Sequence, residues 1–401
     1  MAFLLQDFFV FISSLCIISS QFACSNAFGT TNSFNVLDYG AVGNSITDDS
    51  KAFLKAWNAA CRTPIGTPKV TIPPNKSFLV NPALFRGPCR AEKVDFEISG
   101  SILAPNSPSA WNRLDASQWL AFSSVTGLDV YGMGTIDGRG NRWWDQSCRY
   151  HPQLALKFIS CNESSLRNVH LSNSPQTHVL LLGCNFFDVQ NVKILSPRNS
   201  PNTDGIHIQF SHHLTISHTN IASGDDCVSI GDLTSDLHIS NVNCGPGHGI
   251  SIGSLGKDGN FVQVENIQVD NSFFKGTTNG ARIKTWQVGK GYVRNVRFEN
   301  LHFDSVENPV IIDQNYCNVR GACQELKTGV QVSQVTYKGI HGTSSTDIAI
   351  NLNCSRAVPC TGIHMESINL MAASVGKLVI ADCGNAHGKE TRVVPGPCLK
   401  N

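Results

Sequence analysis

The chain has 401 residues, of which 41% are hydrophobic and only 15% are charged, and this composition excludes a disordered chain. The formal net charge is +1, and the sequence contains no block of basic residues. A nucleic-acid-binding surface is therefore not indicated. An anionic ligand would have to be held by a few placed cations instead.

The first 27 residues are typical of a secretory leader. Residues 8–12 and 15–18 form a short apolar stretch interrupted by serines, which favours a cleaved signal peptide over an uncleaved membrane anchor. Ser25-Asn26-Ala27 supplies small residues for cleavage before Phe28. We therefore expect residues 1–27 to be a signal peptide and the protein to be secreted, with no membrane contact after the leader is removed.

Cysteine usage agrees with export. Fifteen cysteines are present, and loss of Cys16 and Cys24 with the leader leaves an odd number, so at least one thiol stays unpaired. A zinc site is the alternative use, but no Cys-x-x-Cys pair is present. Sequons beginning at Asn75, Asn162 and Asn353 are glycosylation candidates. Spacing does not fix the connectivity, but the close pairs Cys227/Cys244, Cys317/Cys323, Cys354/Cys360 and Cys383/Cys398 are candidate disulfides, with Cys61/Cys89 a longer candidate.

The start of the mature chain predicts an edge strand followed by a helix. Residues 34–41 alternate like a strand, and Thr47-Asp48-Asp49 supplies an N-cap. Helical spacing of apolar residues follows over 52–60. One amphipathic helix would cover the open end of a stacked β structure, where strand edges and apolar core are otherwise exposed.

A repeat then becomes readable. A polar turn residue followed by alternating apolar positions recurs in steps of 23, 22, 23, 30 and 29 residues, at Asn168, Asn191, His213, Asp236, Asn266 and Asn295. Asn, Asp and His tolerate the left-handed backbone of such turns. The longer steps indicate inserted loops, such as residues 253–259. We expect a single β-solenoid domain over residues 28–401; a β-sandwich is the alternative architecture, and the in-register columns argue against it.

Three motifs lie one coil apart: Asn202-Thr203-Asp204-Gly205, Gly224-Asp225-Asp226-Cys227 and Gly247-His248-Gly249. Asp204 and Asp226 are 22 residues apart, as are Asp226 and His248. Strands that stack in register lie about 4.8 Å apart, so three carboxylates and an imidazole would gather on one wall. Paired carboxylates suit glycosidic hydrolysis, with one donating a proton and one activating water. The alternative is a structural ladder of turn residues.

Strand alternation raises a geometric condition for this cluster. Asp204 has the parity of Ile206 and Ile208, so in a regular strand it would point into the core. A functional cluster therefore requires a bend near Gly205, Cys227 and Gly249, which the glycines permit more readily than the cysteine does.

Arg282-Ile283-Lys284 forms a second cluster, on the following coil. Alternation places Arg282 and Lys284 on one face with Ile283 inward. Two adjacent cations suit a carboxylate, which Arg binds bidentately and Lys as a point charge. A solvated basic face is the alternative.

The four motifs, Asn-Thr-Asp, Gly-Asp-Asp, Gly-His-Gly and Arg-Ile-Lys, resemble in order and spacing the signature of the polygalacturonases, the pectin-cleaving family-28 glycoside hydrolases. The resemblance extends to residues 132–138 with Trp143-Trp144, to 173–176 and to 251–254, and so covers nearly the whole mature chain. It implies an all-β fold, a right-handed parallel β-helix, that hydrolyses α-1,4-galacturonan with inversion. The cysteine-rich, helix-capped layout resembles the plant branch.

The resemblance also implies residue roles. Asp225 would be the general acid, Asp204 and Asp226 would hold and deprotonate the water, and His248 would maintain the protonation of the acid. The implied substrate-binding residues are Asn202, Arg282, Lys284 and Tyr316. No metal or other cofactor is implied, and the expected partner is pectic homogalacturonan, bound by a monomer secreted to the cell wall.

Strand spacing of about 4.8 Å would place the carboxylates closer than the ~6.5–9.5 Å typical of inverting enzymes. The resemblance nevertheless implies inversion, because two carboxylates that share one water need less room than one acting alone. A pectate-lyase-like β-eliminase is one rival, and it would need acidic ligands for Ca²⁺ and an arginine base. A pectin-binding protein without catalysis is the other, and the complete acidic trio argues against it.

Overall fold

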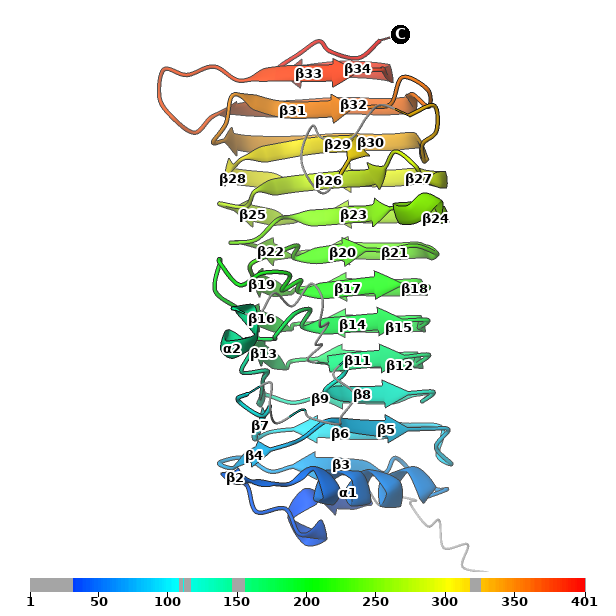
Figure 1. The fold of residues 1–401 in the computed structure, drawn as a ribbon, viewed down its shortest axis with the longest axis vertical. Coiled ribbons are helices and arrows are strands. Elements are labelled where there is room, and N and C mark those ends of the chain that lie inside the picture. The colour runs from blue at the N-terminus through cyan, green and yellow to red at the C-terminus, as the bar shows by residue number, and fades with distance from the viewer. Residues whose placement is uncertain (1–31, 108–110, 112–116, 146–155, 318–325, 401) are drawn as a thin grey trace, which may run out of the picture.

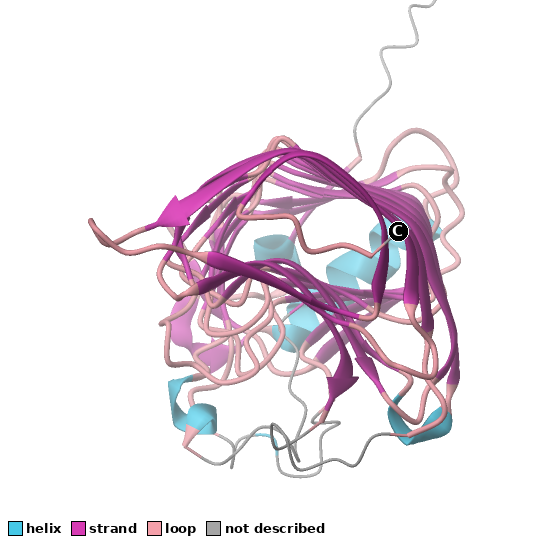
Figure 2. Cartoon of the chain, turned by 90° about the horizontal axis from the view of Figure 1, so that it is seen from above, coloured by secondary structure: helices cyan, strands magenta, loops and turns pink. Residues whose placement is uncertain are grey.

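The computed structural model describes residues 32–107, 111, 117–145, 156–317 and 326–400. In this part of the chain the strands stack coil upon coil into a long β-helix that runs from the N-terminal to the C-terminal end of the molecule (Figure 1). Viewed along the axis, the strands form the walls of the coil (Figure 2). The predicted signal peptide lies outside the described residues.

One wall is an 11-stranded parallel sheet that carries the predicted site. Its strands are β5 (Ala83–Arg86), β8 (Leu120–Ser123), β11 (Leu156–Ile159), β14 (Val179–Leu182), β17 (Ile206–Gln209), β20 (Val228–Ile230), β23 (Ile250–Leu255), β26 (Asn279–Trp286), β29 (Asn308–Tyr316), β31 (Ile348–Asn353) and β33 (Ile380–Gly384).

The remaining strands join into a 23-stranded sheet that completes the coils. They are β1 (Ser33–Asn35), β2 (Asn44–Asp48), β3 (Lys69–Ile72), β4 (Ser77–Leu79), β6 (Val94–Ile98), β7 (Ser101–Leu103), β9 (Leu128–Tyr131), β10 (Thr135–Asp137), β12 (Asn162–Arg167), β13 (His170–Ser172), β15 (Asn185–Gln190), β16 (Lys193–Leu195), β18 (His212–Ser217), β19 (Asn220–Ala222), β21 (Thr234–Ser240), β22 (Asn243–Cys244), β24 (Phe261–Asp270), β25 (Phe273–Lys275), β27 (Lys290–Glu299), β28 (His302–Val306), β30 (Gln331–Ser344), β32 (Cys360–Ala372) and β34 (Ala386–Val394).

The core is built from in-register aliphatic columns, as the repeat predicts. Ile208, Ile230, Ile252, Ile283 and Ile312 are register partners on successive coils, and each is 0% exposed. Such a column buries side chains of one shape against each other along the axis, so apolar area is removed from water coil by coil. The fold is therefore the predicted parallel β-helix and not a sandwich.

The polar turn positions adopt the left-handed backbone expected of them. Asn168, Asn191, His213, Asp236, Asn266 and Asn295 all have φ between 52° and 61°. Their side chains also form a ladder: Asn266 donates to Asp236 at 2.8 Å and accepts from Asn295 at 2.7 Å. The predicted insertion at 253–259 contains the short 3-10 helix η4 (Lys257–Gly259) between β23 and β24.

The predicted lid is helix α1 (Ser50–Arg62), which lies across the N-terminal end of the coil (Figure 1). Its apolar face is buried, and Trp57 Nε1 donates to the Arg86 carbonyl at 3.0 Å. Asp48 accepts from the Ser50 amide at 3.0 Å, whereas Asp49 turns back to the amide of Val42. A second short helix, α2 (Asn141–Trp144), lies beside the middle coils.

The predicted strand over 34–41 is wrong beyond its first residues. Only Ser33–Asn35 is a strand, and the chain then turns into the 3-10 helix η1 (Val36–Tyr39). The Asn35 side chain accepts from the Leu37 amide at 3.0 Å, and this local bond competes with strand pairing.

Four of the five candidate disulfides are present: Cys61–Cys89, Cys227–Cys244, Cys354–Cys360 and Cys383–Cys398. The fifth involves Cys323, which lies outside the described residues. Cys161 and Cys184 are buried free thiols. Among the described residues no helix has the length and apolar character needed to cross a bilayer.

Candidate active site

All eight residues selected from the sequence line one pocket of about 480 Å³ on the outer face of the 11-stranded sheet. They are Asn202, Asp204, Asp225, Asp226, His248, Arg282, Lys284 and Tyr316. They come from the turns that precede β17, β20 and β23, from β26, and from the end of β29.

A bend before each strand brings the carboxylates to the outer face. At Gly205 an added Cβ would lie 2.5 Å from the carbonyl oxygen of Cys227, so a side chain would collide with the next coil. Cys227 occupies the equivalent position, and its side chain enters the core, where it forms the disulfide with Cys244. The chain can therefore bend at both positions, because Gly205 has no side chain and the side chain of Cys227 points into the core. The bends leave Asp204 and Asp226 facing the pocket.

Asp226 is held between two cations. Arg282 Nη2 lies 2.6 Å from one carboxylate oxygen and Lys284 Nζ 3.0 Å from the other, and the Ser251 hydroxyl donates to Asp226 at 2.8 Å. Burial raises the pKa of Asp226, but Arg282 and Lys284 outweigh it and lower the pKa to about 2. We predicted a substrate carboxylate against these cations; the chain itself places a carboxylate there.

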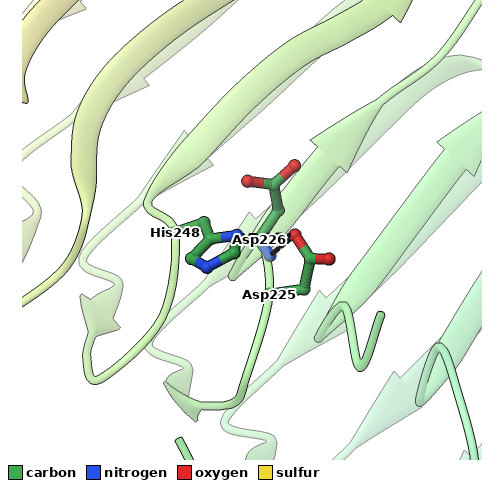
Figure 3. Close-up of side chains that lie close together, drawn as sticks. All are labelled: Asp225, Asp226 and His248. Carbon is green, nitrogen blue, oxygen red and sulfur yellow. Dashed lines mark hydrogen bonds and ion pairs between the residues drawn. The ribbon is translucent and has the colours of Figure 1, made fainter. Parts of the chain in front are cut away.

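Asp225 turns its carboxylate away from that of Asp226 and lies against His248 (Figure 3). His248 Nδ1 is 2.9 Å from Asp225 Oδ1, and the Asn202 amide lies 3.4 Å from Oδ2. The side chains of Asp225 and His248 are 19% and 38% exposed, compared with 2% for Asp226. Asp225 is therefore more accessible to a ligand than Asp226.

Asp204 has the opposite electrostatic environment to Asp226. Burial raises its pKa first, and the charges of Asp225 and Asp226 add to that effect, so its pKa lies well above the usual range. A hydrogen bond from the Ser229 hydroxyl, at 2.5 Å, and the charge of Lys284 oppose the rise. Neighbouring carboxyl groups with pKa values pushed apart are the arrangement that separates acid from base roles.

The same cluster contains side chains of the types that bind metal ions. Asp225, Asp226 and His248 each offer one ligand atom, and these atoms lie within 4.8 Å of one another. Both Asp226 oxygens, however, already accept from Arg282 and Lys284. A divalent cation would have to approach two positive groups at contact distance, so this donor set does not fit a metal.

Sequence analysis assigned no role to three side chains at this site: His207 and Ser229, which line the pocket, and Ser251, which lies buried beside Asp226. His207, Ser229 and Ser251 are register partners on β17, β20 and β23, and Arg282 continues their column on β26. Ser251 joins Asp226 to Arg282, with 2.8 Å to the guanidinium Nε. The signal was the 22-residue spacing itself, because it aligns the middle residue of each short strand as well as the turns.

The groove continues beyond the pocket toward the C-terminal coils. A second hollow of about 680 Å³ shares Arg282, Lys284 and Tyr316 with the first. Tyr316 packs edge-on against Trp286, with ring centroids 5.3 Å apart, and Lys284 Nζ lies 5.8 Å from the Tyr316 ring. Side-chain amides predominate in its lining, which also contains the charged side chains of Asp313 and Arg356; the amides are those of Asn279, Asn308, Asn315, Asn351, Asn353 and Asn385.

Comparison with solved structures agrees with this architecture. The endo-xylogalacturonan hydrolase from Aspergillus tubingensis superposes with a TM-score of 0.78 at 23% identity, covering 91% of this chain and 100% of that chain. The polygalacturonase from Erwinia carotovora gives 0.72 at 24% identity, covering 90% and 97%. At these identities the likeness concerns the fold, a right-handed parallel β-helix.

Sequence relatives are closer. Polygalacturonase QRT2 of Arabidopsis thaliana is 41% identical over 360 residues, 88% of this chain and 81% of the relative. Polygalacturonase-2 of Solanum lycopersicum is 41% identical over 373 residues, 91% of this chain and 80% of the relative. The family model described as Glycosyl hydrolases family 28 matches residues 61–392. This chain therefore belongs to glycosyl hydrolase family 28.

Proposed function

We propose that this protein is a polygalacturonase that hydrolyses the α-1,4-galacturonosyl linkages of homogalacturonan with inversion. The observation that carries the proposal is the carboxyl cluster of Asp204, Asp225 and Asp226 beside the cations Arg282 and Lys284. The carboxyl groups supply acid and base, and the cations can recognise an acidic sugar.

In this mechanism Asp225 donates its proton to the leaving glycosidic oxygen. Its exposure at the pocket and its contact with His248 support that role. Asp204 and Asp226 hold the attacking water and Asp204 accepts its proton, because the two cations beside Asp226 make that carboxylate the weaker base. The water oxygen bonds to the anomeric carbon as the glycosidic bond breaks, one proton passes from Asp225 to the leaving oxygen and one from the water to Asp204, and no covalent intermediate forms.

Substrate binding falls to the residues around the two cations. Arg282 and Lys284 attract the galacturonate carboxylate while remaining close to Asp226, and Tyr316 offers an aromatic face beside them. Asn202 reaches the same pocket from the other side of Asp225.

Oxygens of Asp225 and Asp226 lie within 4.8 Å of one another, less than the ~6.5–9.5 Å usual for inversion. The mechanism accommodates this because one water is shared between two carboxylates.

The test is the release of reducing ends from polygalacturonate, with the anomeric form of the first product read by proton NMR. We expect the β-anomer, whereas retention would contradict the mechanism. An unsaturated, ultraviolet-absorbing product that disappears with chelator would indicate a lyase instead. Absence of any product at high enzyme concentration would leave a pectin-binding protein.

Asp225→Asn removes the proton donor while keeping the shape of the side chain. We expect kcat to fall by at least ~10² with substrate binding largely kept. A near-normal rate would exclude Asp225 as the acid.

We also propose that residues 1–27 are a signal peptide and residues 28–401 one catalytic domain, acting as a secreted monomer in the cell wall without a cofactor. The disulfides within the described coils support an oxidising compartment. N-terminal sequencing of the secreted protein should begin at Phe28.

A further inference from the structure

We propose that His207 and Ser229 are positioning residues that keep Asp204 ionised and thereby direct the proton of the acidic cluster to Asp225. The inference rests on the proposed function, in which Asp225 gives a proton and Asp204 receives one. Neither residue belongs to the four motifs that identify the site.

The three side chains form a continuous hydrogen-bonded chain. His207 Nδ1 lies 2.7 Å from Ser229 Oγ, and Ser229 Oγ lies 2.5 Å from Asp204 Oδ2. The register of β17 and β20 fixes the first contact, because His207 and Ser229 are directly paired. The partner of His207 on the preceding strand is Leu180, so that strand brings no competing polar group to this point.

Proton counting gives the chain a direction. The Ser229 hydroxyl has one hydrogen, and an ionised Asp204 requires that hydrogen to point at Oδ2. His207 must then carry its own proton on Nδ1 and donate it to Ser229. An Asp204 protonated on Oδ2, the oxygen that faces Ser229, would reverse both bonds, because it would donate to Ser229, and Ser229 would then need an unprotonated Nδ1. The Nδ1–H form of His207 thus favours the carboxylate form of Asp204.

The groups that face Asp204 explain why such support is needed. Burial and the carboxylates of Asp225 and Asp226 raise the pKa of Asp204, while Ser229 and Lys284 lower it. Asp226 is already fixed as a carboxylate by its cations, so a single shared proton can lie on Asp225 or on Asp204. Only the first arrangement is productive, and loss of the Ser229 hydrogen bond would favour the second.

One further imidazole, that of His178, contacts the backbone of Asp204. His178 Nδ1 contacts the Asp204 carbonyl at 3.0 Å, and its ring is fully buried. Burial lowers the pKa of His178 to about 4, so it stays neutral over the working range. Burial also lowers the pKa of His207; a side-chain hydrogen bond with Gln209 opposes that effect, and the charges of Asp226 and Lys284 act in opposite senses. A neutral His207 with its hydrogen on Nδ1 meets the requirement of the chain.

The test is the pH profile of Ser229→Ala. Without the hydrogen bond the cluster binds its proton more tightly and places it more often on Asp204. We therefore expect the maximum of kcat to fall about tenfold, the bell to move to higher pH, and KM for polygalacturonate to stay nearly unchanged. Ser229→Thr, which keeps the hydroxyl, should restore both. His207→Leu should reproduce part of the shift, and His207→Asn, which can donate from its amide, should recover it.

Ser235→Ala is the matched control. Ser235 lies 2.9 Å from His212 Nδ1 and donates to Asp236 at 2.9 Å, so it forms the same kind of chain on neighbouring coils but outside the pocket. Its pH profile should equal that of the wild type. A lowered maximum with an unmoved bell in Ser229→Ala would overturn the proposal, because it would indicate a structural role alone.

A second measurement is independent of activity. Carbon-13 NMR of labelled aspartate carboxyl groups should show an Asp204 signal that titrates at higher pH in Ser229→Ala than in the wild type. An unchanged titration would refute the positioning role. If the wild type releases no reducing ends, the proposed function fails, while this titration still decides whether His207 and Ser229 control the ionisation of Asp204.

Discussion

Asp204 and Asp226 lie one coil apart and carry the same functional group, yet their surroundings give them opposite protonation behaviour. Asp226 lies against Arg282 and Lys284, whereas on Asp204 the two neighbouring carboxylates outweigh the Ser229 hydroxyl and the charge of Lys284. The difference in pKa follows from which side chains the neighbouring coils place beside each carboxylate. Residues identical in type thus acquire different tasks through register alone, which is how a repetitive fold can build an asymmetric site.

The ion pairs of Asp226 predict a specific acid sensitivity. Its pKa is lowered from 3.8 to about 2 in the folded protein, so it stabilises the fold above the unfolded value and loses that contribution as pH falls through about 2. The contribution is about 2 kcal/mol. The difference in thermal midpoint between wild type and Asp226→Asn should therefore be largest near pH 5 and shrink between pH 4 and pH 2.

Asp304→Asn is the control for that measurement. Asp304 lies 3.5 Å from Lys275, with side chains 40% and 72% exposed, and solvent-screened pairs of this kind contribute little. Its difference from wild type should be small at every pH. A constant difference for Asp226→Asn from pH 5 to pH 2 would mean that the two cations do not hold its pKa low.

At the scale of single elements, the parallel β-helix combines short strands with turns that repeat one backbone conformation. The ladder through Asp236, Asn266 and Asn295 shows why the turn residues are polar and small: each adopts a positive φ and bonds the same position on the next coil. The strands supply apolar columns, and the turns supply register.

Asn266→Val tests this ladder. The variant loses two amide hydrogen bonds and forces a β-branched residue into a left-handed backbone with φ of 57°. We expect a loss of about 3 kcal/mol in the free energy of unfolding, measured by denaturant titration. Asn266→Gly removes the same bonds without the backbone strain, so it should cost clearly less. Equal losses would show that the backbone conformation carries no penalty there.

The repeat made much of this architecture predictable, because register follows directly from a constant spacing. The alignment of β17, β20 and β23 and the inward position of Ile283 could both be derived from it. The ion pairs of Asp226 could not be derived from the repeat. Periodicity places a side chain on one face of the sheet, but it does not determine which residue of a neighbouring coil a long Arg or Lys side chain will contact. The 3-10 turn after Asn35 escaped prediction because one local hydrogen bond decides it.

For the whole molecule, the sheet that carries the site is long, and its groove extends past the acidic cluster. Arg282, Lys284 and Tyr316 belong both to the pocket and to the hollow that follows it, so the two are continuous. Beyond these cations the lining contains mainly amides, which suit sugar hydroxyls, together with one carboxylate, Asp313, and one further cation, Arg356. A polymer bound along the groove would therefore cross several coils, with its carboxylates bound near Arg282 and again near Arg356, and its hydroxyls bound by the amides between them.

This arrangement predicts that a distant asparagine affects only long substrates. Asn351 lies on β31, two strands from β26 and so roughly 10 Å beyond Arg282 along the sheet. Asn351→Ala should lower kcat/KM about fivefold for long oligogalacturonides, the effect of one lost hydrogen bond, and should leave the shortest cleavable oligomers unaffected because they do not reach β31. Asn243→Ala, which alters an amide in a separate surface hollow, should change neither. An equal loss for short and long substrates would place the action of Asn351 on the acidic cluster, and no loss for either would mean that the polymer leaves the sheet before β31.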